Sequence, residues 1–152
     1  MNEEQQLIGE MARRMLDDHC GPAVVDAAEQ GDYPSALWTL LVDNGLTTLG
    51  IDEALGGAGG TFGDALVVLR EAGRKAAPLP LAETLLAGQL LSSLEQRLPT
   101  GPMCFVQGDV SLNESGQLQG SVHGVKFARH CQTLLVAARR GEDPVICHIP
   151  AA

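Results

Sequence analysis

The fold of this chain is decided by residues 37–63, which read LWTLLVDNGLTTLGIDEALGGAGGTFG. The first part of this stretch places apolar side chains at helical spacing: Leu37, Trp38, Leu41 and Val42. The pattern predicts a helix with one inward face. Asn44-Gly45 predicts the end of that helix, because glycine readily adopts the left-handed conformation that follows a helix. The middle of the stretch is then expected to be a loop that ends in a run of glycines.

The glycine run Gly56–Gly60 reads GGAGG. Glycine-rich loops can cradle a phosphate when a helix follows them. A Walker loop requires Gly-Lys-Ser/Thr, which this run lacks, and a dinucleotide fingerprint would need its third glycine at Phe62. We therefore predict a tight structural turn. Thr61, followed three residues later by Asp64, resembles a capping box, which predicts that the next helix begins there.

Three further segments are predicted to be helical, and they cover residues 3–20, 23–30 and 81–97. The last of them carries leucines around much of its circumference, a pattern that implies burial on more than one side. We predict that it is the most buried helix of the amino-terminal part, with Leu86 and Leu90 in the core.

After residue 102 the spacing of apolar residues changes from helical to strand-like. Short runs of aliphatic and β-branched residues, separated by turn signals, predict strands at Met103–Gln107, Leu118–Val125, Leu134–Ala138 and Val145–Ile149. We therefore predict an α+β chain. An all-α helical domain covers residues 1–100, and an incomplete, partial antiparallel β domain covers residues 101–152.

The charge of the chain excludes two classes of partner. The net charge is −9, with 15 acidic and 6 basic side chains in residues 1–100. An acidic surface repels phosphate backbones, so nucleic acid is not an expected partner. No stretch approaches the roughly 20 apolar residues that cross a bilayer, and the acidic, polar start lacks the features of a secretory signal. We expect a cytoplasmic protein that does not associate with membranes.

No residue of the chain stands in a context that predicts catalysis or metal binding. The cysteines show no C-x-x-C spacing and are expected to be reduced, partly buried thiols: Cys20, Cys104, Cys131 and Cys147. No Gly-x-Ser-x-Gly nucleophile elbow is present. Glu83 opens the leucine-rich helix, where a carboxylate is stabilised by the helix dipole without any chemical role. We expect no metal site and keep Glu83 only as a secondary candidate for a catalytic base.

Four groups of residues recur in this order in one known family. They are LWTLLVDNGLTTLGI at 37–51, GGAGG leading into TFGD at 56–64, LREAGR and APLPLAETLLAG between 69 and 88, and LQGSVHGV, ARH and LLVAA between 118 and 138. Taken together, they resemble the acyl-CoA dehydrogenase family. The resemblance covers nearly the whole chain.

The resemblance implies a flavoprotein oxidoreductase. In this family an amino-terminal helical domain, a middle β domain and a carboxy-terminal helical bundle hold FAD and an acyl-CoA thioester. The flavin accepts a hydride from the β carbon while a glutamate removes the α proton. The resemblance also implies a homo- or hetero-oligomer, an electron-transfer flavoprotein as a possible partner, and a role in fatty acid or steroid side-chain metabolism. It places Leu81, Thr84 and Leu85 beside the acyl chain, although ordinary core packing explains these residues equally well.

The chain departs from the family pattern at the residues that contact the flavin in the family. The family begins its β domain with a Thr-Glu-Pro-Gly segment, whereas residues 105–109 read FVQGD. The family's Trp-Ile-Thr/Ser aligns with Gly124-Val125-Lys126, which leaves Phe127 as the candidate for the flavin-facing aromatic if the register shifts slightly. The family's base lies on the carboxy-terminal bundle, so we expect no catalytic residue in this chain.

These departures leave three hypotheses open. The first is an acyl-CoA dehydrogenase represented here by a shortened form or a partial gene product, inactive on its own. The second is a non-catalytic partner subunit that kept the scaffold and lost the flavin motif. The third is an unrelated helical binding module.

Overall fold

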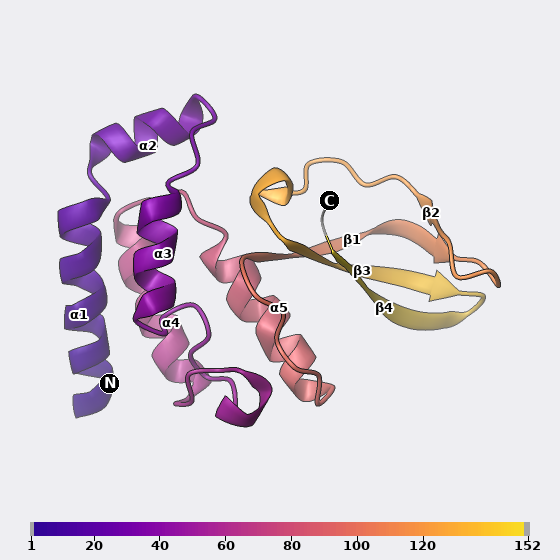
Figure 1. Cartoon of the computed structure of the whole chain (residues 1–152), viewed down its shortest axis with the longest axis horizontal. Coiled ribbons are helices and arrows are strands. Elements are labelled where there is room, and N and C mark those ends of the chain that lie inside the picture. Colours follow the sequence, from indigo (N-terminus) through magenta and orange to yellow (C-terminus); the bar gives the residue numbers. More distant parts are fainter. Residues whose placement is uncertain (1, 151–152) are drawn as a thin grey trace. The chain divides into compact units, whose positions relative to one another are not determined.

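The computed structural model describes residues 2–150 and divides the chain into two compact units, Met1–Leu98 and Pro99–Ala152. The first unit is helical and the second is built on a sheet (Figure 1). The change from helices to strands falls between residues 93 and 103, as the change in apolar spacing predicted. None of the helices within residues 2–150 combines the length and the apolar composition that a membrane span needs.

The helical unit forms elements at the predicted places. They are α1 (Glu3–His19), α2 (Pro22–Glu29), α3 (Ser35–Asp43), the 3-10 turn η1 (Glu53–Leu55), α4 (Phe62–Arg74) and α5 (Leu81–Ser93). Helix α4 begins where the capping box predicted it, because the Asp64 carboxylate accepts the Thr61 N–H at 2.7 Å and the Thr61 hydroxyl at 2.8 Å. The same hydrogen bonds hold the pKa of Asp64 below its ordinary value.

The core of this unit is made of apolar side chains from α1, α3, α4 and the start of α5. Its fully enclosed members include Leu16, Leu41, Val68 and Leu85. Helix α1 packs against α4. The predicted face of α3 is buried at Leu37, Trp38 and Leu41, whereas Val42, which was predicted on the same face, is 43% exposed.

Helix α5 corrects one sequence prediction. It ends at Ser93, earlier than expected, and it buries six residues, the same number as α4. Leu85 is fully buried, whereas Leu86 is 57% exposed and Leu90 is half-buried. Successive residues of a helix are turned by about 100°, and the buried face of α5 carries Leu81, Thr84 and Leu85, so Leu86 falls on the opposite side. The prediction that Leu86 lies in the core is wrong.

Up to residue 150, the second unit contains four strands: β1 (Met103–Leu112), β2 (Leu118–Gly120), β3 (Thr133–Arg140) and β4 (Asp143–Pro150). The strand order is β2-β1-β3-β4. The outer pairs are antiparallel, and the central pair β1 and β3 is parallel. The α+β class is confirmed, but the sheet is mixed rather than antiparallel throughout.

The parallel pairing of β1 and β3 follows from the path of the chain between β2 and β3. Strand β2 is shorter than predicted, and residues 121–132 then bring the chain back to the start of β1. There the Gln132 N–H donates to the Pro102 carbonyl at 2.8 Å, and β3 begins in register with β1 at Met103 and Thr133. Because the return path ends beside the start of β1, β3 must run in the same direction.

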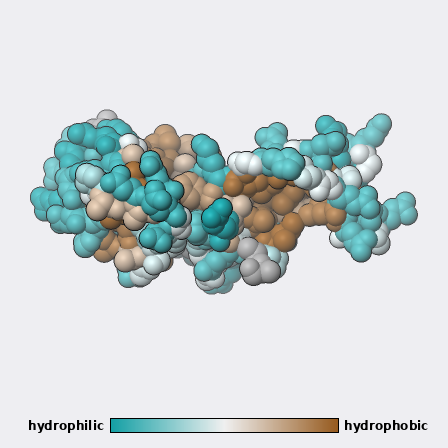
Figure 2. All heavy atoms as spheres, turned by 90° about the horizontal axis from the view of Figure 1, so that it is seen from above, coloured by the Kyte–Doolittle hydropathy of each residue, from teal (hydrophilic) through white to brown (hydrophobic). Residues whose placement is uncertain are grey.

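One face of the sheet carries its own apolar core. Alternate residues of the paired strands point to this face: Val106, Val110, Val136 and Ala138. Partly buried apolar side chains surround them, and Figure 2 shows apolar side chains reaching the surface over the strands. On the opposite face, Phe105 and Ile146 are exposed.

Candidate functional site

The glycine run is a tight turn. Four successive amides donate to carbonyls of the same loop: Gly56 to Glu53, Gly57 to Asp52, Ala58 to Thr48 and Gly59 to Ile51, at 2.9 to 3.1 Å. Amides that are used in this way cannot cradle an anion. The prediction of a structural turn is confirmed.

The three residues that the family resemblance placed beside the acyl chain lie in the first turns of α5. Leu81, Thr84 and Leu85 are all buried, and the two leucines belong to the core of the helical unit. Leu81 also lines a hollow of about 200 Å³ between the end of α4 and the start of α5. Contact of these residues with an acyl chain stays a prediction.

Phe127, the candidate for a flavin contact, belongs to the other unit. It precedes the 3-10 turn η2 (Ala128–His130), where its carbonyl accepts the His130 N–H at 2.8 Å. Its backbone is left-handed, with φ of 57°, and its side chain is half-buried. These hydrogen bonds fix the backbone at Phe127, and contact of its ring with a flavin stays a prediction.

Among the described residues, no group of three or more His, Cys, Asp or Glu side chains could hold a metal ion. The four cysteines form no disulfide, and all except the half-buried Cys147 are buried. Glu83 lies in the first turn of α5, where a carboxylate suits the helix dipole.

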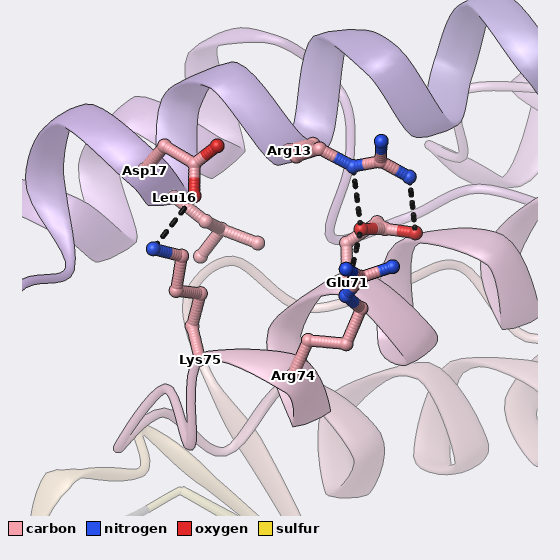
Figure 3. Close-up of a pocket in the computed structure, with 6 residues that line it drawn as sticks. All are labelled: Arg13, Leu16, Asp17, Glu71, Arg74 and Lys75. Carbon is pink, nitrogen blue, oxygen red and sulfur yellow. Dashed lines mark hydrogen bonds and ion pairs between the residues drawn. The ribbon is translucent and has the colours of Figure 1, made fainter.

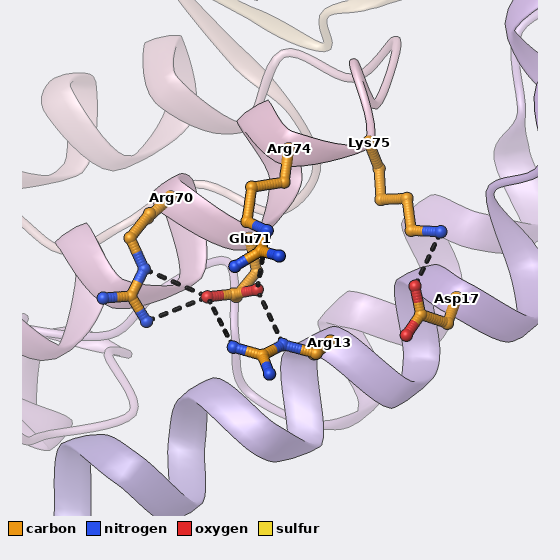
Figure 4. Close-up of polar contacts among 6 residues, drawn as sticks. All are labelled: Arg13, Asp17, Arg70, Glu71, Arg74 and Lys75. Atoms are coloured by element: carbon orange, nitrogen blue, oxygen red, sulfur yellow. Dashed lines mark hydrogen bonds and ion pairs between the residues drawn. The ribbon is translucent and has the colours of Figure 1, made fainter.

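The most elaborate polar cluster was not predicted from the sequence. The Glu71 carboxylate on α4 is 1% exposed and accepts hydrogen bonds from Arg13 Nε at 3.1 Å and from Arg70 Nη2 at 2.8 Å. Arg74 Nε lies 3.9 Å away. Figure 4 shows the three guanidinium groups pointing at this one carboxylate. Because Arg13 stands on α1, the cluster ties α1 to α4.

A second ion pair borders the same place. Lys75 Nζ lies 2.6 Å from Asp17 Oδ1. Together with the Glu71 cluster, this pair lines a hollow of about 280 Å³ between α1 and the end of α4 (Figure 3). Both pairs connect the same two helices, so the hollow is bordered by charges that already have partners.

The hydrogen bonds of the cluster disfavour acid–base work by Glu71. The hydrogen bond from Arg13 holds the pKa of Glu71 below its ordinary value, although burial acts in the opposite direction. The same contact raises the pKa of Arg13. A carboxylate that stays ionised to low pH is a poor proton acceptor at neutral pH. The cluster is therefore structural.

One sequence signal could have found Glu71. The buried residues of α4 recur at helical spacing, and Val67, Val68 and Ala72 share one stripe with Glu71. A carboxylate inside an apolar stripe, with arginines directly before it and three residues after it, predicts a buried ion pair. Arg13 is 58 residues away in sequence and could not have been assigned by such local reasoning.

The lowered pKa of Glu71 predicts how stability depends on pH. A carboxylate with a lowered folded-state pKa stabilises the fold above its unfolded pKa of about 4.3, and this contribution is lost as the pH falls through the folded value. Glu71→Gln should lower the free energy of unfolding by about 1 to 2 kcal/mol at pH ~7. The difference from the wild type should shrink below pH ~4. Urea unfolding followed by far-UV circular dichroism at several pH values measures both effects.

The control for this prediction is Glu29→Gln. Glu29 is exposed at the end of α2, and its replacement should change stability by less than about 0.5 kcal/mol at every pH. A Glu71→Gln difference that stays constant from neutral to acid pH would contradict the electrostatic explanation.

Comparison with known proteins identifies the family. The family profile "Acyl-CoA dehydrogenase, N-terminal domain" matches residues 2–95. The acyl-CoA dehydrogenase IpdE2 of Mycobacterium tuberculosis is 44% identical over 128 residues, which cover 72% of this chain and 40% of that protein. The IpdE2 of Mycolicibacterium smegmatis is 34% identical over 139 residues, which cover 88% of this chain and 45% of that protein.

Solved structures agree with the fold. The Tcur3481-Tcur3483 steroid ACAD, solved as a variant, superposes with a TM-score of 0.85 and 26% identity, over 97% of this chain and 48% of that one. The ChsE4-ChsE5 complex from Mycobacterium tuberculosis superposes with a TM-score of 0.83 and 20% identity, over 99% and 48%. The chain thus spans less than half the length of these relatives. With a matching family profile over most of its helical unit and two curated relatives, the chain belongs to the acyl-CoA dehydrogenase family.

Proposed function

We propose that this chain contributes the amino-terminal helical domain and part of the middle β domain to an FAD-dependent acyl-CoA dehydrogenase. The reaction is α,β-dehydrogenation of an acyl-CoA thioester. The observation that carries the proposal is the match of the family profile to residues 2–95. The steroid ACAD superposes over 97% of the chain, which favours a steroid-derived acyl group as the substrate class.

The residues present do not form a flavin site by themselves. Gly124 and Lys126 stand where the family has an aromatic and a hydroxyl side chain, and Phe127, which is half-buried, is the one Phe, Tyr or Trp of residues 121–132. The family's flavin-contacting segment is replaced by residues 105–109, which form part of β1. We propose that polypeptide other than residues 1–152 supplies the catalytic base and most of the contacts to FAD. Leu81, Thr84 and Leu85 would lie beside the acyl chain of the substrate.

The isolated chain should not bind FAD tightly. Losing three flavin contacts at about 1.4 kcal/mol each weakens binding roughly a thousandfold. The purified chain should be colourless, and titration with FAD should leave the flavin fluorescence unchanged at micromolar concentrations. Addition of an acyl-CoA and an artificial electron acceptor should give no reduction. Stoichiometric uptake of FAD with reduction of the acceptor would show that the site lies within these residues.

A chimera tests the proposed function directly. The chain replaces the matching segment of the Mycobacterium tuberculosis IpdE2 relative, and the unmodified relative is assayed in parallel. If the chain is a catalytic component, the chimera should take up FAD and reduce the acceptor on addition of a CoA thioester to the same extent as the relative. A folded chimera without this activity, beside an active relative, would reject the proposal.

A second candidate function is a non-catalytic partner subunit in a heteromeric acyl-CoA dehydrogenase. Two observations favour it: the missing flavin residues, and the fold shared with a two-component complex named ChsE4-ChsE5. In this case the chimera should fold without FAD, and replacing Gly124 by Trp and Lys126 by Thr in it should restore part of the flavin binding. We propose in addition that the enzyme is a homo- or hetero-oligomer and that it is cytoplasmic. An electron-transfer flavoprotein would accept its electrons.

A further inference from the structure

Two cysteines of the sheet unit lie against each other. Cys104 stands on β1, and Cys131 directly follows η2, 27 residues later. Their sulfur atoms are 2.7 Å apart. Cys104 is fully buried, and Cys131 is 5% exposed. The bond length of a disulfide is about 2.05 Å, so a small movement of one side chain would close the bond.

The backbone holds this pair in place from both sides. The Cys131 N–H donates to the Phe127 carbonyl at 3.2 Å, and the neighbouring Gln132 N–H donates to the Pro102 carbonyl at 2.8 Å. The Cys104 thiol also lies 3.5 Å from the Lys126 carbonyl. All of these contacts lie within the sheet unit. The proximity of the sulfur atoms therefore follows from the return path that makes β1 and β3 parallel.

We propose that Cys104 and Cys131 are a thiol-oxidation site that forms an intramolecular disulfide when the protein meets a peroxide. Hydrogen peroxide oxidises the slightly exposed Cys131 thiol to a sulfenic acid, and the peroxide is reduced to water. The Cys104 sulfur then attacks the Cys131 sulfur and forms the S–S bond, the S–O bond of the sulfenic acid breaks, and its hydroxyl leaves with the proton of the Cys104 thiol as a second water. In sum, two thiols and one peroxide become one disulfide and two waters.

The disulfide has a structural consequence for its surroundings. It links β1 to the end of residues 121–131, the segment that carries Phe127. A cross-link acts by reducing the conformational freedom of the chain that it closes. Oxidation therefore fixes this segment against β1. This inference does not depend on the proposed function, because it concerns only the two thiols and their backbone.

The other two cysteines serve as internal controls. Cys20 lies in the helical unit, where burial raises the pKa of its thiol, and a raised pKa lowers thiol reactivity. Cys147 lies on β4 opposite Val136. All four cysteines fall in different tryptic peptides, with Cys104 in residues 98–126 and Cys131 in residues 130–139. Mass spectrometry can therefore assign every possible pairing.

The experiment treats the folded 152-residue chain with hydrogen peroxide, and in a second arm with oxidised glutathione, before unfolding, alkylation and digestion with trypsin. The expected product joins the peptides 98–126 and 130–139 and is lighter by two hydrogen atoms than their sum. Before unfolding, oxidation should slow cleavage after Lys126 and Arg129 at least several-fold. Cys147→Ser should leave the product unchanged, and Cys131→Ser should abolish it.

Two results would overturn the proposal. In the first, the wild-type chain stays folded and the Cys104 and Cys131 peptides are recovered fully alkylated after treatment with hydrogen peroxide, whatever the glutathione arm gives. In the second, Cys104 is joined to Cys20 or Cys147 as often as to Cys131, which would show that the pairing is random. Neither result depends on the folding of a variant, because both are measured on the wild-type chain.

Discussion

Leu85→Ala should lower the free energy of unfolding of the helical unit by about 3 to 5 kcal/mol. Leu85 is fully buried among core side chains from α1, α3 and α4. Removal of a buried leucine side chain loses its transfer free energy and leaves a cavity, because a close-packed core relaxes only in part. Urea unfolding followed by the helical circular dichroism signal measures the change.

The next residue in sequence provides the matched control. Leu86 is 57% exposed on the same helix. Leu86→Ala should change the free energy of unfolding by less than about 0.5 kcal/mol, since it removes little buried surface. The two variants have the same composition and differ only in the face of α5 that they alter. Equal losses for both variants would contradict the burial of α5 described here.

Gly57→Ala should lower the free energy of unfolding by about 3 kcal/mol, because it places a methyl group where the loop has no room. A Cβ atom at Gly57 would lie 2.1 Å from the Ile51 carbonyl oxygen and 2.4 Å from its carbonyl carbon. These are backbone atoms, and Ile51 is held there by its pairing with Gly59. The clash can be relieved only by opening the turn that joins η1 to α4.

Gly73→Ala tests whether the loss at Gly57 is due to the clash. Gly73 is exposed near the end of α4, and a Cβ there meets no atom within 4 Å. Alanine favours the helix over glycine by about 0.5 to 1 kcal/mol, so this substitution should stabilise the chain. In chemical unfolding, Gly57→Ala should lower the free energy of unfolding and Gly73→Ala should raise it, although both replace a hydrogen atom by a methyl group. A loss at Gly57 below about 1 kcal/mol would show that the turn yields easily.

The predictions that succeeded from sequence were those that depend on local signals. The helical stripe around Trp38, the cap formed by Thr61 and Asp64 and the turn at the glycine run each involve residues a few positions apart. Neighbouring residues decide such features, because helix periodicity, capping and backbone freedom act over one or two turns. The order of these local signals also carried the resemblance to the family.

The tertiary structure decided whatever joins distant parts of the chain. Arg13 and Glu71 meet across 58 residues, and Cys104 and Cys131 meet across 27. The direction of β3 depends on where residues 121–132 return, which the strand pattern leaves open because a period of two is the same in parallel and antiparallel sheets. Helix α5 has leucines on several sides, so its sequence does not determine which leucine faces the core. The packing of α5 against the rest of the helical unit buries Leu85 and leaves Leu86 exposed. Sequence periodicity thus determined the elements, and the contacts between those elements determined the buried charge, the thiol pair and the mixed sheet.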